Sequence, residues 1–120
     1  MNRELGRFGE NWAAGALTRA GYRILDRNVR YRQGEIDLVA YDGEELVFVE
    51  VKCRRTFAFG RPEESITAAR YGRLASAVER YLAERHLSPP SYRVDVIAIQ
   101  VDGHGRVAQH EHFRGVEAPR

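Results

Sequence analysis

The stretch EIDLVAYDGEELVFVEVKC, residues 35–53, decides the fold of this chain. It contains two runs rich in valine and other strand-forming residues, Glu35–Tyr41 and Leu46–Cys53. Between them lies the tetrapeptide DGEE, in which Asp42-Gly43 marks a turn. Two strands joined by so short a polar loop predict a β-hairpin.

Side chains alternate between the two faces of a strand, so the predicted hairpin has two distinct surfaces. One face is wholly apolar and comprises Ile36, Leu38, Ala40, Val47, Val49, Val51 and Cys53. The other face is apolar near the turn but ionisable at the far end, where it carries Glu35, Asp37, Glu50 and Lys52. Because both faces are apolar near the turn, we expect a central hairpin that is covered on both sides.

The pairing of the two strands brings two carboxylates together. With DGEE as the loop, Tyr41 pairs with Leu46, and Asp37 then lies opposite Glu50. Opposed side chains have Cβ atoms about 4.5–5.5 Å apart, and like charges there are destabilising. Such a pair beside buried surface needs a cation or a shared proton. Carboxylates suit Mg²⁺, and the neighbouring Lys52 is placed to orient a metal-bound water or to stabilise charge on a phosphate.

Lys52 is the only lysine in a chain that has 18 arginines. A lysine is a compact charge whose pKa shifts when it is partly buried, whereas an arginine stays protonated and needs room for its planar fork. The position of Lys52, beside paired carboxylates in an apolar strand, therefore indicates a chemical role. The alternative is a structural ion pair between Lys52 and Glu50 or Asp37.

Hydrophobic periodicity places the other elements around the hairpin. The predicted elements are a helix over residues 5–20, a short strand over 22–25, a segment over 27–32 that either extends this strand or leads into the next, a helix after the N-cap Thr67 that ends before residue 88, a strand over 92–101 and a polar edge strand over 106–113. The order α-β-β-β-α-β-β predicts an α/β fold with a central mixed sheet flanked by helices. We expect one domain over residues 1–114 and a flexible tail over 115–120.

The composition excludes several classes of protein. Hydrophobic residues make up 43% of the chain and charged residues 30%, and the net charge is only +2. No apolar run approaches the length of a membrane span. The single cysteine, Cys53, excludes an internal disulfide and fits a reducing compartment. We therefore expect a soluble cytoplasmic protein that does not bind membranes.

Arginines flank the hairpin on both sides. The candidates for binding a nucleic-acid backbone are Arg30, Arg32, Arg54, Arg55 and Arg61. The planar guanidinium binds phosphate oxygens in pairs, which favours this interpretation. The alternative is a solvated surface in an arginine-rich chain. The nearby aromatic residues Tyr31, Phe57 and Phe59 are suited either to stacking on bases or to filling packing gaps.

Other ionisable residues have less specific interpretations. Glu10 lies at the flank of the apolar stripe of the first helix, and Glu35 either joins the metal site or is solvated at the start of its strand. Asp95 is expected to be structural, paired with an arginine such as Arg93 or with a helix residue. The three histidines near the C-terminus, His104, His110 and His112, fit an exposed edge strand better than a zinc site.

An acidic helix residue followed by Asp and then Glu-x-Lys on adjacent strands resembles the PD-(D/E)XK nuclease superfamily. The residues concerned are Glu10, Asp37, Glu50 and Lys52. The segments GEIDLVA, LVFVEVKCR, FGRP and RLASAVERYL resemble the small bacterial YraN-like family, which is similar to archaeal Holliday-junction resolvases. The superfamily's proline before the aspartate is absent here, and Ile36 stands in its place.

This resemblance implies a restriction-endonuclease-like fold and metal-dependent hydrolysis of phosphodiester bonds, with branched or structured DNA as the expected substrate. It implies that Asp37, Glu50 and the backbone carbonyl of Val51 hold Mg²⁺ or Mn²⁺. Lys52 would position or activate the attacking water, and Glu10 would reach the site from the first helix. Resolvase-like relatives act as dimers, which makes a homodimer plausible. The alternative function is a nucleic-acid-binding module that keeps the fold but lacks catalysis.

Overall fold

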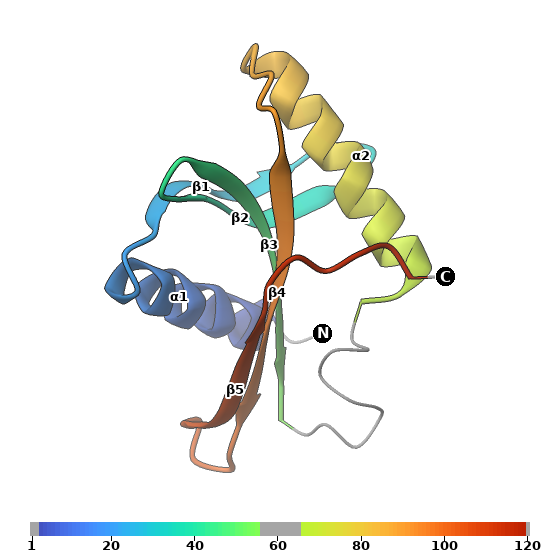
Figure 1. Cartoon of the computed structure of the whole chain (residues 1–120). Helices are drawn as coiled ribbons and strands as arrows, with labels where there is room; N and C mark the ends of the chain where they lie inside the picture. The colour runs from blue at the N-terminus through green and yellow to red at the C-terminus, as the bar shows by residue number, and fades with distance from the viewer. Residues whose placement is uncertain (1–2, 56–65, 120) are drawn as a thin grey trace.

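The computed structural model describes residues 3–55 and 66–119, which form a five-stranded sheet with one helix on each face (Figure 1). The elements are α1 (Arg3–Arg19), β1 (Arg23–Arg30), β2 (Glu35–Asp42), β3 (Glu45–Arg54), α2 (Ala68–Glu84), β4 (Tyr92–Val101) and β5 (Val107–Phe113). The strands lie in sequential order, and only β3 and β4 are parallel. The predicted element order and the mixed α/β sheet are confirmed, and they are consistent with a restriction-endonuclease-like fold.

The central hairpin has the predicted register. Tyr41 pairs with Leu46, and Asp42 also pairs with Glu45, so the loop is only Gly43 and Glu44. Gly43 has a φ of 63°, in the left-handed region that a two-residue hairpin turn requires. The loop is therefore two residues shorter than the tetrapeptide that the sequence suggested.

Each face of the sheet carries its own apolar core. The α1 side contains Leu38 and Val49 among its buried residues, and the α2 side contains Phe48 and Tyr81. Ile36 belongs to the α2 side, so its predicted place beside Leu38 is wrong. Ile36 lies beyond the last pair of β2 with β3, which is Leu38 with Val49, and is paired with Val29 of β1.

Both edges of the sheet are irregular. The segments over 22–25 and 27–32 form the single strand β1, with a shift in register between Ile24 and Asp26. Within β1, Asn28 has a φ of 52°, which is uncommon for a residue with a side chain. The polar strand β5 forms the opposite edge, as predicted.

Helix α2 begins where the sequence indicates. The hydroxyl of Thr67 accepts a hydrogen bond of 3.1 Å from the backbone N–H of Arg70, which confirms Thr67 as the N-cap. The aromatic candidates Phe57 and Phe59 lie outside the described residues. Within residues 3–55 and 66–119, neither helix combines the length and apolar character needed to span a membrane.

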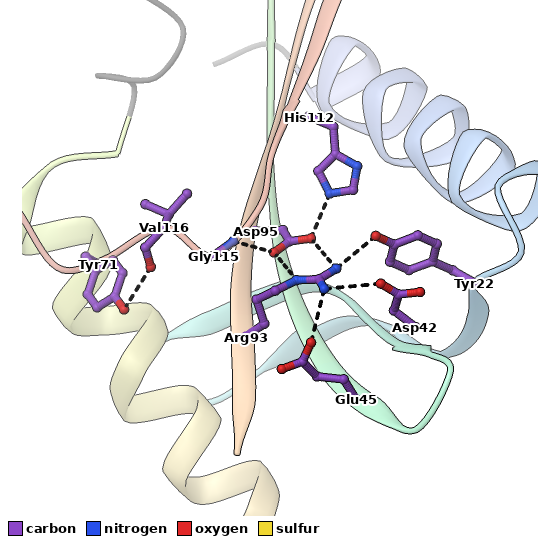
Figure 2. Close-up of polar contacts among 9 residues, drawn as sticks. All are labelled: Tyr22, Asp42, Glu45, Tyr71, Arg93, Asp95, His112, Gly115 and Val116. Atoms are coloured by element: carbon purple, nitrogen blue, oxygen red, sulfur yellow. Dashed lines mark hydrogen bonds and ion pairs between the residues drawn. The ribbon is translucent and has the colours of Figure 1, made fainter.

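A polar cluster around Arg93 links β4 to the hairpin turn, as Figure 2 shows. The guanidinium of Arg93 donates two hydrogen bonds to Asp95, of 2.8 and 3.1 Å, and further bonds to Tyr22, Asp42 and Glu45. Asp95 is fully buried. The predicted pairing of Asp95 with Arg93 is therefore confirmed.

The same cluster anchors the end of the chain. Asp95 also contacts His112 Nε2 at 2.7 Å and accepts a hydrogen bond of 3.0 Å from the N–H of Gly115 (Figure 2). Val116 N–H donates to the carbonyl of Val94. His112 is thus bonded to a buried carboxylate rather than exposed, and the first two residues of the segment 115–120 are attached to the domain.

Gly34, between β1 and β2, touches the backbone of α2 and predicts a stability effect. A Cβ built at Gly34 would lie 1.9 Å from the carbonyl oxygen of Arg73, so Gly34→Ala must push α2 away from the sheet. We expect a loss of about 3 kcal/mol in the free energy of unfolding, measured by urea denaturation. The control is Gly103→Ala, because no atom lies within 4 Å of a Cβ there. Equal denaturation midpoints for the two variants would contradict this contact.

Candidate metal centre

Residues from both faces of the sheet meet at a cavity of about 250 Å³. The cavity lies at the end of the hairpin away from the turn, beyond the last pair of β2 with β3. Its lining residues are Gly6, Glu10, Arg30, Glu35, Asp37, Val51, Lys52, Cys53, Arg54 and Arg70. The structure therefore brings together the four predicted catalytic residues, Glu10, Asp37, Glu50 and Lys52, although Glu50 lies behind the wall, bonded to Arg70.

Asp37 lies in β2, one residue beyond its last pair with β3, where the space between the strands opens. Its carboxyl is buried, and its Oδ2 accepts a hydrogen bond of 2.7 Å from the backbone N–H of Val51. Burial and then the carboxylate of Glu50 raise the pKa of Asp37 to about 8. Asp37 therefore retains a proton at neutral pH when no metal is bound.

Glu50 has the opposite charge state. Burial acts to raise its pKa, but hydrogen bonds from Arg70 and Asp37 outweigh burial and lower it. The guanidinium of Arg70 binds both oxygens, through Nε to Oε2 at 2.5 Å and Nη2 to Oε1 at 2.9 Å. The expected proximity of Asp37 and Glu50 is thus realised as one protonated and one ionised carboxyl group.

Arg70 is the functional residue that the sequence did not identify. Its remaining nitrogen, Nη1, donates to Glu35, which also pairs with Arg30 at 2.6 Å. The hydrogen bond from Arg70 lowers the pKa of Glu35. The solvated interpretation of Glu35 is therefore wrong, because Glu35 supports Arg70 beside the site. A signal was present, since Arg70 interrupts an otherwise apolar helical stripe that runs from Ile66.

Lys52 remains available for chemistry. Its Nζ lies 3.9 Å from Oε2 of Glu50, beyond hydrogen-bond distance, and only 17% of its side chain is exposed. Burial lowers the pKa of Lys52 despite the nearby carboxylates. The ion pair with Glu50 that was the alternative for Lys52 is therefore present, but Arg70 is the closer partner of Glu50, at 2.5 and 2.9 Å.

Helix α1 packs closely on β3, and this contact brings Glu10 to the cavity. A Cβ built at Gly9 would lie 2.6 Å from Cβ of Cys53, so only glycine allows α1 to pack this closely on the strand. Glycine weakens a helix, by about 1 kcal/mol relative to alanine. Here it places the adjacent Glu10 at the cavity, where its charge contributes to the raised pKa of Asp37.

Of the described arginines predicted to bind nucleic acid, the structure places two at the cavity. Arg30 and Arg54 line the cavity, whereas Arg32 and Arg55 are exposed and do not line it. Arg61 lies outside the described residues. The cavity thus has basic groups at its rim in addition to the acidic groups in its wall.

The donor set fits a hydrated magnesium ion. Among residues 3–55 and 66–119, no three His, Cys, Asp or Glu side chains are grouped to hold a metal by themselves. Mg²⁺ commonly uses only one or two carboxylates and completes its shell with water and phosphate oxygens. Asp37 and Glu50 supply that number, and Val51 lies beside them in the cavity wall. Binding requires Asp37 to lose its proton and Arg70 to release an oxygen of Glu50.

Replacing Arg70 tests this balance of charges. We expect Arg70→Gln to destabilise the metal-free protein by about 3 kcal/mol, because Glu50 stays buried without its cation. Mn²⁺ should restore part of the lost stability, because it supplies positive charge beside Glu50. Denaturant titrations in EDTA and in Mn²⁺ would measure the free energy of unfolding in the two conditions. The control Arg80→Gln removes an exposed pair with Glu84 and should cost less than about 0.5 kcal/mol. Equal losses in the two variants would contradict the role of Arg70.

Comparison with known proteins places the chain in a family. The model described as "Uncharacterised protein family UPF0102" matches residues 9–99, which include the whole candidate site from Glu10 to Arg70. A UPF0102 protein of Symbiobacterium thermophilum is 50% identical over 107 residues, which cover 89% of this chain and 91% of that protein. A UPF0102 protein of Arthrobacter sp. (strain FB24) is 46% identical and covers 93% of this chain and 94% of its own length. The chain therefore belongs to the UPF0102, or YraN-like, family.

Proposed function

We propose that this protein is a metal-dependent endonuclease that hydrolyses phosphodiester bonds in branched or structured DNA. The observation that carries the proposal is the pair of buried carboxyl groups, Asp37 and Glu50, together with Lys52, which lines the same cavity as Asp37 and lies 3.9 Å from Glu50. The order of these residues on α1, β2 and β3 supports membership of the PD-(D/E)XK superfamily. A structural core has no need for two carboxyl groups in contact.

Each residue has a chemical task in the proposed reaction. Asp37 and Glu50, with the carbonyl of Val51, would hold Mg²⁺ or Mn²⁺. When bound, such an ion polarises a phosphoryl oxygen and lowers the pKa of a coordinated water. Lys52 donates hydrogen bonds to the attacking water or to the phosphate, where charge develops in the transition state. Glu10 contributes a further carboxylate from α1.

The second candidate is a nucleic-acid-binding module without catalysis. The contact that favours it is the pair of hydrogen bonds from Arg70 to the two oxygens of Glu50, which neutralises this carboxylate without any metal. In that case the basic rim of the cavity would bind phosphates while the carboxylates remained structural. Metal binding separates the two candidates, because only the nuclease needs Glu50 to exchange Arg70 for an ion.

A cleavage assay tests the proposal. Four-way junction, flap, single-stranded and duplex DNA are incubated with the wild-type protein in Mg²⁺ or Mn²⁺, beside Asp37→Asn. The control Glu44→Gln removes an acidic group at the hairpin turn, at the other end of the strands. We expect cleavage by the wild type and by Glu44→Gln, and none by Asp37→Asn. Cleavage that persists in Asp37→Asn contradicts the assigned site, and binding without cleavage of any substrate favours the second candidate.

A further inference from the structure

A second cavity adjoins the candidate metal centre along α1. It has a volume of about 470 Å³ and is lined by Arg3, Gly6, Arg7, Glu10, Asn28 and Arg30. Gly6, Glu10 and Arg30 line both cavities, so the two cavities adjoin, and the second is called the groove below. The residues on α1 recur with helical spacing, which places them on a single side of the helix.

The size of the metal-centre cavity explains why a substrate needs this second cavity. Its volume of about 250 Å³ is smaller than the pockets of about 300–1,000 Å³ that usually hold small-molecule ligands. That volume accommodates a hydrated ion and one phosphate group, but not the nucleotides on either side of it. A bound strand must therefore continue beyond the cavity, and the adjoining groove is an exit that the structure provides.

The groove has the charge that a phosphate backbone requires. Arg3 and Arg7 are exposed, and within the described residues neither is bonded to a carboxylate. Arg30 pairs with Glu35 but keeps a largely exposed side chain, 65% accessible. Arg3 and Arg7 stand one helical turn apart, so both can face the same strand. Gly6, between them, has no side chain to obstruct the groove.

The opposite wall shows backbone strain. Asn28 lines the groove and adopts the left-handed conformation inside β1, with a φ of 52°. Such a conformation is unfavourable for residues other than glycine, although asparagine tolerates it better than most. Strained residues of this kind cluster at binding sites, where the surrounding structure holds them in place. Asn28 thus lines the same cavity as Arg3 and Arg7.

We infer that the nucleic-acid strand leaves the metal centre along this groove, with the phosphates that flank the scissile bond bound by Arg3 and Arg7. The inference rests on the proposed function and adds a backbone-binding track to it. The ligand is the phosphodiester backbone itself, so these contacts add affinity without reading base sequence. Glu10 marks the point where the track meets the metal centre.

Binding without chemistry tests this inference. Fluorescence anisotropy measures the affinity for a labelled four-way junction in EDTA, across a series of salt concentrations, for the wild type and for Arg3→Gln/Arg7→Gln. Each lost phosphate contact should lower the slope of log K against log salt by about 0.9 and the affinity about fivefold at 0.15 M salt. The control is Arg19→Gln, at the other end of α1 and about 24 Å from Arg3.

The outcomes of this experiment distinguish the backbone-binding track from the proposed nuclease function. A reduced slope and affinity in the double variant, with Arg19→Gln unchanged, supports the track. Wild-type binding that the double variant retains in full overturns the track but leaves the proposed nuclease intact. Failure of the wild type to bind junction, flap, single-stranded or duplex DNA overturns both the track and the proposed function.

Discussion

Lys52→Ala should lower the rate of DNA cleavage by about 10³-fold while the protein stays folded and still binds Mn²⁺. A positioned proton donor or acceptor typically contributes about 10²–10⁴-fold to a reaction. Lys52 is mostly buried, has a lowered pKa and lies 3.9 Å from the nearest oxygen of Glu50, so its loss removes no strong structural bond. Single-turnover cleavage at saturating protein and calorimetric titration with Mn²⁺ measure the two effects separately.

Lys52→Arg is the matched control for charge. It keeps the positive charge but replaces a compact ammonium with a planar fork, which the cavity of about 250 Å³ must accommodate. We expect it to bind DNA as the wild type does and to cleave poorly. Cleavage by Lys52→Ala at more than about a tenth of the wild-type rate would show that Lys52 has no chemical role.

Asp95→Asn should lower the free energy of unfolding by about 3 kcal/mol, far from the metal centre. Asp95 is fully buried and receives hydrogen bonds from Arg93 and from the backbone of Gly115, so Asp95→Asn removes the buried carboxylate partner of Arg93 and leaves Arg93 only the more exposed Asp42 and Glu45. The end of β5 and the segment after it should loosen at the same time. Urea denaturation measures the loss, and hydrogen exchange at Gly115 and Val116 measures the loosening.

The pH dependence of this loss has a definite sign. Burial acts to raise the pKa of Asp95, but the bonds to His112 and Arg93 outweigh burial and lower it. A carboxylate with a lowered folded-state pKa contributes stability above its unfolded pKa of about 3.9, and the contribution disappears as the pH falls further. The difference between wild type and Asp95→Asn should therefore shrink below pH about 4. The exposed control Glu79→Gln should cost less than about 0.5 kcal/mol, and a similar cost for Asp95→Asn would refute the role of this cluster.

The hairpin and much of the site could be predicted from sequence because both depend on local alternation. Once Tyr41 pairs with Leu46, the period of two residues places Asp37 near Glu50 and Lys52 on the same side as Glu50. The prediction failed at Ile36, where β2 has already separated from β3.

The parts that could not be predicted depend on how distant elements pack. Arg70 reaches Glu50 only because α2 crosses the sheet at one position, which Gly34 permits by its contact with Arg73. The bond between His112 and Asp95 likewise depends on the pairing of β4 with β5. Helical spacing places Arg70 within an apolar stripe, but the sequence does not show which residue it bonds.

Calorimetric titration with Mn²⁺ tests most directly the central claim that Asp37 and Glu50 form a metal site. We predict that the wild type and Glu44→Gln bind Mn²⁺, and that Asp37→Asn and Glu50→Gln bind at least about tenfold more weakly. Because the pKa of Asp37 is about 8, the affinity should rise with pH up to about 8, with proton release below it. Absence of Mn²⁺ binding by the wild type, or equal binding by all four proteins, would contradict the claim.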